Sequence, residues 1–427
     1  MMMTATSNQQ EPKRVIIVGA GMVGLSCAYS LTKRAGIEVR VIEREAIGVG
    51  ASSGNAGLIA AGHPPIPRPG LIWQAIKWMF DSKSPLYIPP RFERALLGWL
   101  WNFRKACTLD VFLRSMDCLA ELGRETMKCF ETIRGDEYFD ENVVEYRAGG
   151  LIDVFKTVEG RDKCRIDADM LRQRGFEIEE LSRDELHERE PAYRDDVIGG
   201  MVMNDSAFAN PAQFVTELAS CVRRHGVDVR ENSYVKEIIV RDDRFVGVRL
   251  NDGEVVEGDA LVLSAGIWSS GLGDQLGIRI PMQAAKGYNI DLTPPDVNIR
   301  MAGVLKETFI AVNPIEPGLR LAGTLEFAGL NDRLSKRRLE MLVIGAKQYV
   351  RGIEGLERVS EWCGFRPCTA DGLPVIGRAP RIQNVFIATG HAMMGFALGP
   401  VTGRLVCNLM FGDESDINVE PYSPNRF

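Results

Sequence analysis

The chain has 427 residues, of which 45% are hydrophobic, and its 51 Lys and Arg against 57 Asp and Glu give a formal net charge of −6. Because this length exceeds what one hydrophobic core usually holds, we expect a globular protein with two domains. The acidic balance and the lack of a long Lys/Arg run exclude a nucleic-acid-binding face and favour small metabolites as partners.

The cysteines favour a reducing, cytoplasmic location. Nine of them stand at scattered positions without a regular framework, and the odd number leaves at least one unpaired. Residues 1–13 are polar, so we expect a disordered leader and not a signal peptide. No stretch reaches the roughly 18 apolar residues of a spanning helix, so any membrane association should be peripheral. The four His lack the spacing of a zinc site, and no metal is expected.

The amino-terminal segment predicts a strand, a helix and a second strand. Val15 to Val18 form a short apolar run, Leu25, Ala28 and Leu31 follow at helical spacing, and Glu38 to Ile42 come next as the second strand. A glycine-rich turn with the G-x-G-x-x-G pattern joins the first strand to the helix; it consists of Gly19, Ala20, Gly21, Met22, Val23 and Gly24. Glu43 ends the second strand about 20 residues further on, as a Rossmann dinucleotide site requires.

These residue types suit a dinucleotide. Glycines allow a tight turn and close approach of the backbone to the pyrophosphate, which faces the amino terminus of the helix. The Glu43 carboxylate can accept from ribose hydroxyls, and it disfavours the 2′-phosphate of NADP. The fingerprint leaves NAD and FAD open. A stretch of small residues from Gly50 to Gly57 narrows the choice, because a backbone can lie close to a flat ring or phosphate there; an ordinary flexible loop is the alternative for this stretch.

The remainder of the chain alternates between helical and strand-like segments. We expect mostly helices from Gly70 to Gly160 and a helix from Pro211 to His225. Strands are predicted at 227–240, 245–250, 261–263 and 385–388, an antiparallel sheet over 278–330, and a helix at 395–410. The nucleotide-binding features are therefore split along the chain. We predict a discontinuous cofactor domain (14–70, 201–275 and 355–427) and a substrate domain (71–200 and 276–354).

Four blocks together resemble one family of enzymes. They are the glycine fingerprint with Ser52 to Gly57, the segment Leu263 to Trp268, the segment Trp362 to Gly377, and the segment Ala388 to Phe396. In this order they resemble the D-amino acid oxidase and dehydrogenase family, and most closely its bacterial D-amino acid dehydrogenases and D-hydroxyproline dehydrogenases. The resemblance implies an α/β fold, with a discontinuous FAD-binding Rossmann-type domain and a substrate domain built on an antiparallel sheet and helices.

The resemblance also implies which residues meet FAD. The glycine turn would hold the pyrophosphate, Glu43 and Arg44 would lie at the ribose, and the Val235 backbone would meet the adenine. Along the flavin side and the dinucleotide it places Ser52, Ser53, Asn55, Ala56, Gly57, Ala265, Gly266, Gly390, His391, Met394 and Gly395. Covalent flavin on Cys363 or Cys368 is an alternative seen in sarcosine-oxidising relatives, but the surrounding residues fit the non-covalent branch.

Arg366 is the predicted substrate residue. Its planar fork of donors suits bidentate recognition of a carboxylate, and in the family the Arg of the G-x-R-P block has this role. The alternative is a structural Arg paired with an acid such as Asp371. His63, His391 and Tyr288 are further candidates for the pocket, although each has an ordinary structural explanation. Ala392 replaces the glycine common in D-amino acid dehydrogenases, which leaves the side-chain preference open.

The function implied is oxidative deamination of a D-amino acid, with hydride transfer from the α carbon to flavin N5 and hydrolysis of the imino acid to a 2-oxo acid and ammonia. D-Hydroxyproline dehydrogenation and glycine or sarcosine oxidation are the alternatives, and an NAD-dependent dehydrogenase or a flavoprotein subunit of a larger complex stays open. The acceptor is either oxygen or a quinone at the inner face of the membrane. Apolar segments at 73–80 and 95–103 suit a membrane surface or simple internal packing equally.

Overall fold

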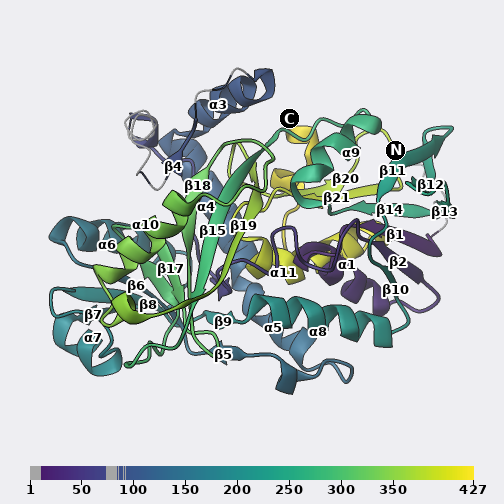
Figure 1. Cartoon of the computed structure of the whole chain (residues 1–427). Coiled ribbons are helices and arrows are strands. Elements are labelled where there is room, and N and C mark those ends of the chain that lie inside the picture. Colours follow the sequence, from purple (N-terminus) through teal and green to yellow (C-terminus); the bar gives the residue numbers. More distant parts are fainter. Residues whose placement is uncertain (1–10, 74–83, 85, 90, 92) are drawn as a thin grey trace.

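The computed structural model describes residues 11–73, 84, 86–89, 91 and 93–427. Most of the leader expected at residues 1–13 and most of the apolar segment 73–80 lie outside the described residues. Two large sheets dominate the fold, and each forms the centre of one half of the molecule (Figure 1). The α/β class predicted from the sequence is confirmed.

A six-stranded sheet contains the predicted nucleotide-binding strands. Its order is β10-β2-β1-β14-β21-β20, and only β20 runs antiparallel to its neighbour. The strands are β1 (Arg14–Val18), β2 (Glu38–Ile42), β10 (Asp228–Arg230), β14 (Ala260–Leu263), β20 (Val375–Arg378) and β21 (Val385–Thr389). Because side chains alternate along a strand, Val15 and Ile17 face one side, whereas Ile16 and Val18 face the other.

The two faces of this sheet are covered differently. Helices α1 (Met22–Thr32), α8 (Pro211–Arg224) and α11 (Gly395–Phe411) share a hydrophobic core with the first face. The second face packs against a small antiparallel sheet of β11 (Val235–Arg241), β12 (Arg244–Leu250) and β13 (Val255–Glu257), next to α9 (Ser269–Gln275). The result is a three-layer arrangement in which every long strand is buried on both sides.

One predicted strand is wrong in this region. Residues 227–240 do not form a single strand but divide into β10 and β11, which belong to different sheets. Asn232 has a φ of 54°, in the left-handed region where a strand cannot continue. The Asn232 and Ser233 amides bond to the carbonyls of Glu45 and Glu43, so the chain turns next to the end of β2.

The second large sheet has the order β19-β15-β18-β17-β16-β6-β8-β7, with β4 (Leu86–Tyr87) beside β18. Its strands are β6 (Leu151–Phe155), β7 (Ile178–Ser182), β8 (Gly199–Met203), β15 (Met282–Leu292), β16 (Gly303–Leu305), β17 (Ile310–Asn313), β18 (Leu319–Glu326) and β19 (Arg358–Thr369). Most pairs are antiparallel, but β16 with β6 and β18 with β4 are parallel, so the sheet is mixed. Strands β5 (Tyr146–Ala148) and β6 also interrupt the segment predicted as mostly helical, because Leu151 to Phe155 is an apolar run that the sheet buries.

Helices surround this sheet. They are α6 (Val158–Arg172), α7 (Arg183–Arg189) and α10 (Lys336–Lys347). Helix α3 (Arg94–Ala106) projects at the upper edge of the molecule, and α4 (Leu109–Arg124) and α5 (Thr126–Arg134) follow it (Figure 1). Short strands β3 (Leu58–Ile59) and β9 (Ala207–Ala209) join β5 in a three-stranded sheet. Among the described residues no helix has the length and apolar character needed to cross a bilayer.

The predicted domain boundaries stay a prediction. Strand β19 pairs with β15 in the large sheet, although the predicted cofactor domain resumes at residue 355. After β19 the chain returns to the six-stranded sheet through β20 and β21 and ends beyond α11. The pairing therefore favours a boundary after β19.

Candidate functional site

One large cavity of about 1670 Å³ extends from the carboxyl ends of β1, β2 and β14 to the large sheet. The predicted site residues that line it are Gly19, Gly21, Met22, Val23, Glu43, Arg44, Ser52, Asn55, Ala56, His63, Val235, Ala265, Gly266, Tyr288, Arg366, His391, Met394 and Gly395. Ala20, Gly24, Ser53, Gly57 and Gly390 are not among the lining residues. Parallel strands with a helix at their carboxyl ends form a typical nucleotide site, and the cavity begins there.

Two of the fingerprint glycines have packing roles. At Gly19 the φ is +109°, and a Cβ atom would lie 2.6 Å from the carbonyl oxygen of Ser264. At Gly24 a Cβ atom would lie 1.9 Å from the carbonyl oxygen of Gly19. Gly21 lines the cavity and is the N-cap of α1, whose start carries no capping side chain. The Met22 amide is held by Ser52 Oγ at 3.0 Å, so the loop from Gly50 to Gly57 closes over the helix start.

Glu43 connects the second strand to the glycine turn. One carboxylate oxygen accepts from the Ala20 amide at 2.8 Å, and the other accepts from the Glu45 amide at 3.1 Å. Each oxygen keeps a second lone pair for a hydroxyl. Arg44 stacks on the Trp268 ring at 3.7 Å, and both residues line the cavity next to Val235. No role was predicted for Trp268, although it lies two positions after the predicted Gly266.

The loop from Gly50 to Gly57 is fastened to the large sheet by three side chains that the sequence analysis missed. Arg320 donates to the carbonyls of Ser53 and Asn55 at 3.3 and 3.0 Å. Asn313 donates to the Ala56 carbonyl at 2.7 Å, and Asn289 donates to the Gly54 carbonyl. These contacts lie more than 230 positions apart in the chain, so no local pattern signals them. They hold the loop against the cavity.

Arg320 is itself held by a buried ion pair. Its Nε and Nη2 donate to the two Asp291 carboxylate oxygens at 2.7 and 2.9 Å. Burial acts to raise the pKa of Asp291, but the ion pair with Arg320 outweighs burial and the pKa is lowered. The pair therefore keeps both charges and fixes the guanidinium where it meets the loop.

Trp362 fills the space between the loop and β19. A Cβ atom on Gly54 would lie 2.3 Å from the indole, and one on Gly364 would lie 2.1 Å from it. Trp362 and Gly364 both line the cavity. The two glycines thus make room for a flat aromatic side chain at this wall.

Arg366 reaches into the cavity from β19. Its Nη1 donates to the Thr324 carbonyl at 2.8 Å, and burial lowers the pKa of the guanidinium. No carboxylate of the described part of the chain forms an ion pair with it. The alternative partner considered above, Asp371, instead pairs with Arg426 at 2.7 Å. A desolvated cation without a counter-ion is a physical signal for an anionic ligand.

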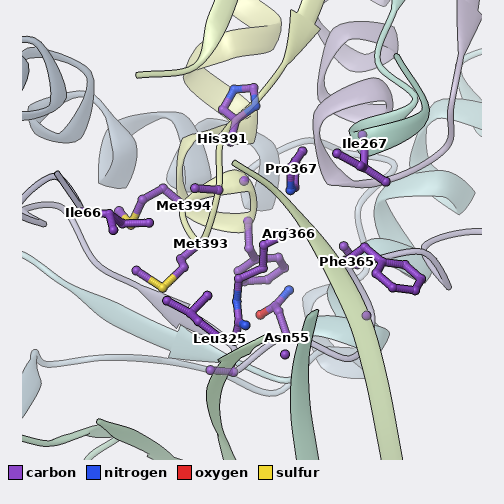
Figure 2. Close-up of a pocket in the computed structure, with 18 of the residues that line it drawn as sticks. Asn55, Ile66, Ile267, Leu325, Phe365, Arg366, Pro367, His391, Met393 and Met394 are labelled. Carbon is purple, nitrogen blue, oxygen red and sulfur yellow. The ribbon is translucent and has the colours of Figure 1, made fainter. Parts of the chain in front are cut away.

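The wall on one side of Arg366 is apolar. In Figure 2 Leu325 and Met393 lie on one side of the Arg366 side chain, with Met394 and Ile66 farther along that side, and the Asn55 amide lies on the other side. Ala392, which precedes the two methionines, has a φ of 49°, and its amide donates to the Pro367 carbonyl at 3.0 Å. The turn that a glycine would favour is thus formed with alanine, and it presents Met393 and Met394 to the cavity.

The remaining candidates have structural partners. The ring of His391 points away from Arg366 (Figure 2), is buried, and its Nε2 lies 2.9 Å from Thr402 Oγ1. Burial lowers the pKa of His391 to about 3, so the ring is neutral. The Tyr288 hydroxyl donates to Glu326 at 2.6 Å. His63 Nδ1 lies 2.6 Å from the Pro64 carbonyl.

Neither Cys363 nor Cys368 is among the residues that line the cavity.

Elsewhere, Asp136, Cys221 and His225 offer three ligand atoms within 4.8 Å of one another. The Asp136 carboxylate already accepts from Lys33, Tyr29 and His225. Asp136 lies 85 positions from Cys221 and 89 from His225 in the sequence, so no local pattern signals the cluster. It lies away from the cavity, and Lys33 already supplies a positive charge there.

These features fit FAD. The cavity exceeds the roughly 300–1,000 Å³ of a drug-sized pocket, as a long dinucleotide requires. A backbone without side chains at Gly19 and Gly21, a carboxylate at Glu43 and an uncapped helix start at α11 are the donors and acceptors that such a cofactor needs. The site therefore has the features of a dinucleotide-binding site.

The profile of the DAO family, described as FAD dependent oxidoreductase, matches residues 14–409. The chain belongs to this family, and FAD is its cofactor. The predicted cofactor is thus confirmed, as is the family part of the resemblance.

Solved structures agree with this fold. The glycine oxidase from Geobacillus kaustophilus superimposes with a TM-score of 0.77 at 24% identity, covering 97% of this chain and 99% of that one. The L-proline dehydrogenase from P. horikoshii gives a TM-score of 0.74 at 18% identity, with 98% of both chains covered. The iminodiacetate oxidase from Chelativorans sp. BNC1 gives 0.72 at 22% identity, covering 96% and 99%. At these identities the likeness establishes the fold.

Proposed function

We propose that this protein is an FAD-dependent D-amino acid dehydrogenase. The observation that carries the proposal is the Arg366 guanidinium, which faces the cavity without a carboxylate partner among the described residues. A planar cation of this kind binds a carboxylate through two parallel hydrogen bonds. The order of the sequence blocks supports the D-amino acid branch. The substrate thus carries a carboxylate and, on the adjacent carbon, the amine that is oxidised.

In this proposal the protein acts mainly by orienting the substrate. When bound, FAD supplies the acceptor for the hydride that leaves the α carbon. Arg366 holds the carboxylate and so fixes the position of the α carbon. The apolar side chains of Leu325, Met393 and Met394 keep water away from the cavity wall next to Arg366. Positioning of this type can supply a large share of the rate enhancement. The imino acid that results hydrolyses in water to the 2-oxo acid and ammonia.

No strong general base is required from the protein. His391 is neutral and bonded to Thr402, so it acts as a support for the turn before α11 and not as a base. We assign the cofactor roles as the sequence suggested: the glycine turn at the pyrophosphate, Glu43 at the ribose, Val235 at the adenine, and the start of α11 at the flavin. The helix start favours negative charge there.

The apolar wall bears on the side chain of the substrate. Ile66, Leu325, Met393 and Met394 offer apolar surface and no hydrogen-bonding group to a substrate side chain. This favours D-amino acids with an apolar side chain over glycine, which would leave the wall uncovered. cis-4-Hydroxy-D-proline and sarcosine are the alternative substrates. A screen of D- and L-amino acids, glycine, sarcosine and cis-4-hydroxy-D-proline with an artificial acceptor tests the proposal, and turnover of L-amino acids alone would refute it.

The proposed electron acceptor is a quinone at the inner face of the membrane. On α3, Leu97 is 47% exposed and Trp101 56% exposed, and Arg104 and Lys105 lie over the Trp101 ring. Apolar side chains flanked by cations suit an anionic membrane surface. Ala95, on the same helix, lines the cavity.

Two measurements test this acceptor. Holoenzyme should sediment with vesicles that contain anionic lipid, and Trp101→Ser should weaken that binding. Reduction of a soluble quinone should exceed peroxide formation in air. Rapid peroxide production without quinone reduction would assign oxygen as the acceptor.

A further inference from the structure

Strand β18 contains a bulge beside Arg366. Lys286 on β15 pairs with Glu326 on β18, and Tyr288 pairs with Gly323. Two residues of β18, Thr324 and Leu325, therefore stand opposite the single residue Gly287. Bulges of this type redirect side chains and are common next to active sites.

Thr324 is held in an unusual backbone conformation at this bulge. Its φ is 60°, in the left-handed region that β-branched residues rarely adopt. Strain of this kind persists only where the surrounding structure holds it in place, and it is frequent at binding sites. The same residue also contacts Arg366, because the Thr324 carbonyl accepts a hydrogen bond from Arg366 Nη1 at 2.8 Å.

The Thr324 side chain lies at the cavity with a hydroxyl that is unpaired within the described part of the chain. Thr324 is 8% exposed and lines the cavity together with Leu325 and Arg366. Its Oγ1 is buried without a hydrogen-bond partner among the described residues. A buried hydroxyl left unpaired is costly, so a partner from a bound molecule is expected.

We propose that Thr324 is a second substrate-binding residue, whose hydroxyl donates a hydrogen bond to the carboxylate held by Arg366. One residue then has two functions: its carbonyl orients the guanidinium, and its hydroxyl adds a neutral donor next to it. Because Nη1 is directed at the carbonyl, the Nε and Nη2 donors are left for the carboxylate, which still has lone pairs for a third donor. This inference rests on the proposed carboxylate-bearing substrate.

The test uses two variants that separate the hydroxyl from the shape of the side chain. Thr324→Val keeps the branched shape and removes the hydroxyl, and Thr324→Ser keeps the hydroxyl and removes the methyl group. Propanoate is titrated into each holoenzyme and followed by calorimetry and flavin absorbance, with propanamide as the uncharged control. We expect Thr324→Val to weaken propanoate about 10-fold and Thr324→Ser to stay within about twofold of the wild type. With the best substrate of the screen, KM should follow the same order.

Equal propanoate affinity in Thr324→Val and the wild type would overturn the inference, as would a Ser variant as weak as the Val variant. Should Thr324→Val fail to fold, Thr324→Ala takes its place with the same expectation. Arg366→Met separates failure of the proposed function from failure of the proposed role of Thr324. If wild-type protein binds propanoate no better than propanamide and Arg366→Met changes nothing, the proposed function fails, and the role of Thr324 fails with it.

Discussion

The guanidinium of Arg366 lies directly over Gly287, so closely that a Cβ atom at residue 287 would come within 2.0 Å of Nη1. The two residues are on neighbouring strands, where Gly287 pairs with Gly364 and Ala285 pairs with Arg366. Because Gly287 on β15 has no side chain, the Arg366 side chain can pass over it and reach the Thr324 carbonyl. The position of the substrate cation depends on a glycine that carries no chemistry of its own.

Gly287→Ala should displace Arg366 and weaken carboxylate binding. Loss of a hydrogen bond to a charged group costs about 1.5–3 kcal/mol, so we expect KM to rise by about 10-fold or more with a smaller change in kcat. Steady-state kinetics with the best substrate measure this. Gly98→Ala is the matched control, because a Cβ atom there meets no atom within 4 Å; an unchanged KM in Gly287→Ala would contradict the prediction.

Arg320→Met should release the loop from Gly50 to Gly57 and weaken FAD binding. The change removes two donors to the loop and leaves Asp291 buried without its cation, and breaking such a pair costs about 3–5 kcal/mol. FAD retention after gel filtration and the Tm of the holoenzyme are the measurements. Arg351→Met, which removes an exposed pair with Asp195, serves as the control. Full FAD retention in Arg320→Met would show that the contacts of Arg320 with the loop are not needed for FAD binding.

His391 should make the protein less stable in mild acid. Its folded pKa of about 3 lies below the value of about 6.5 in the unfolded chain, so between these values the unfolded state binds the extra proton. Stability from this group is complete above pH 6.5 and falls as the pH drops, by about 2 kcal/mol at pH 5. Between pH 7.5 and pH 5 the Tm of His391→Asn should fall less than that of the wild type. Parallel curves for the two proteins would show that His391 does not titrate on unfolding.

The flavin should be non-covalent, because Cys363 and Cys368 are not among the residues that line the cavity. Acid precipitation should leave all flavin in the supernatant, and Cys363→Ser and Cys368→Ser should retain FAD and turnover. Flavin that stays with the precipitated wild type, and is lost from one of these variants, would assign a covalent bond to that cysteine.

Local patterns predicted the fold best. The strand from Val15 to Val18, the glycine turn and the helix beginning at Pro211 depend on residues close together in the chain, and all three are present. The break at Asn232 was missed because a left-handed asparagine is set by tertiary contacts with the end of β2. The apolar run from Leu151 to Phe155 is typical of a buried strand, but it was included in a segment predicted as mostly helical because the residues around it have helical character.

Residues that line the cavity were predicted where they belong to the family blocks and missed where distant strands supply them. Arg366 was proposed from its block and lines the cavity, whereas its neighbours Thr324 and Gly287 come from two other strands whose register no local pattern reveals. The question whether Asp371 neutralises Arg366 also depended on the carboxyl-terminal Arg426, 55 positions away. Pairings of this range follow from the packed fold.

The most direct test of the account is the role of Arg366. Arg366→Lys keeps the charge but not the planar fork, and Arg366→Met removes both. With the best amino acid substrate, kcat/KM should fall about 10-fold or more in Arg366→Lys and further in Arg366→Met, while both variants keep their FAD and their Tm. An Arg366→Met enzyme that retains FAD and wild-type kcat/KM would contradict the central claim that this guanidinium binds the substrate carboxylate.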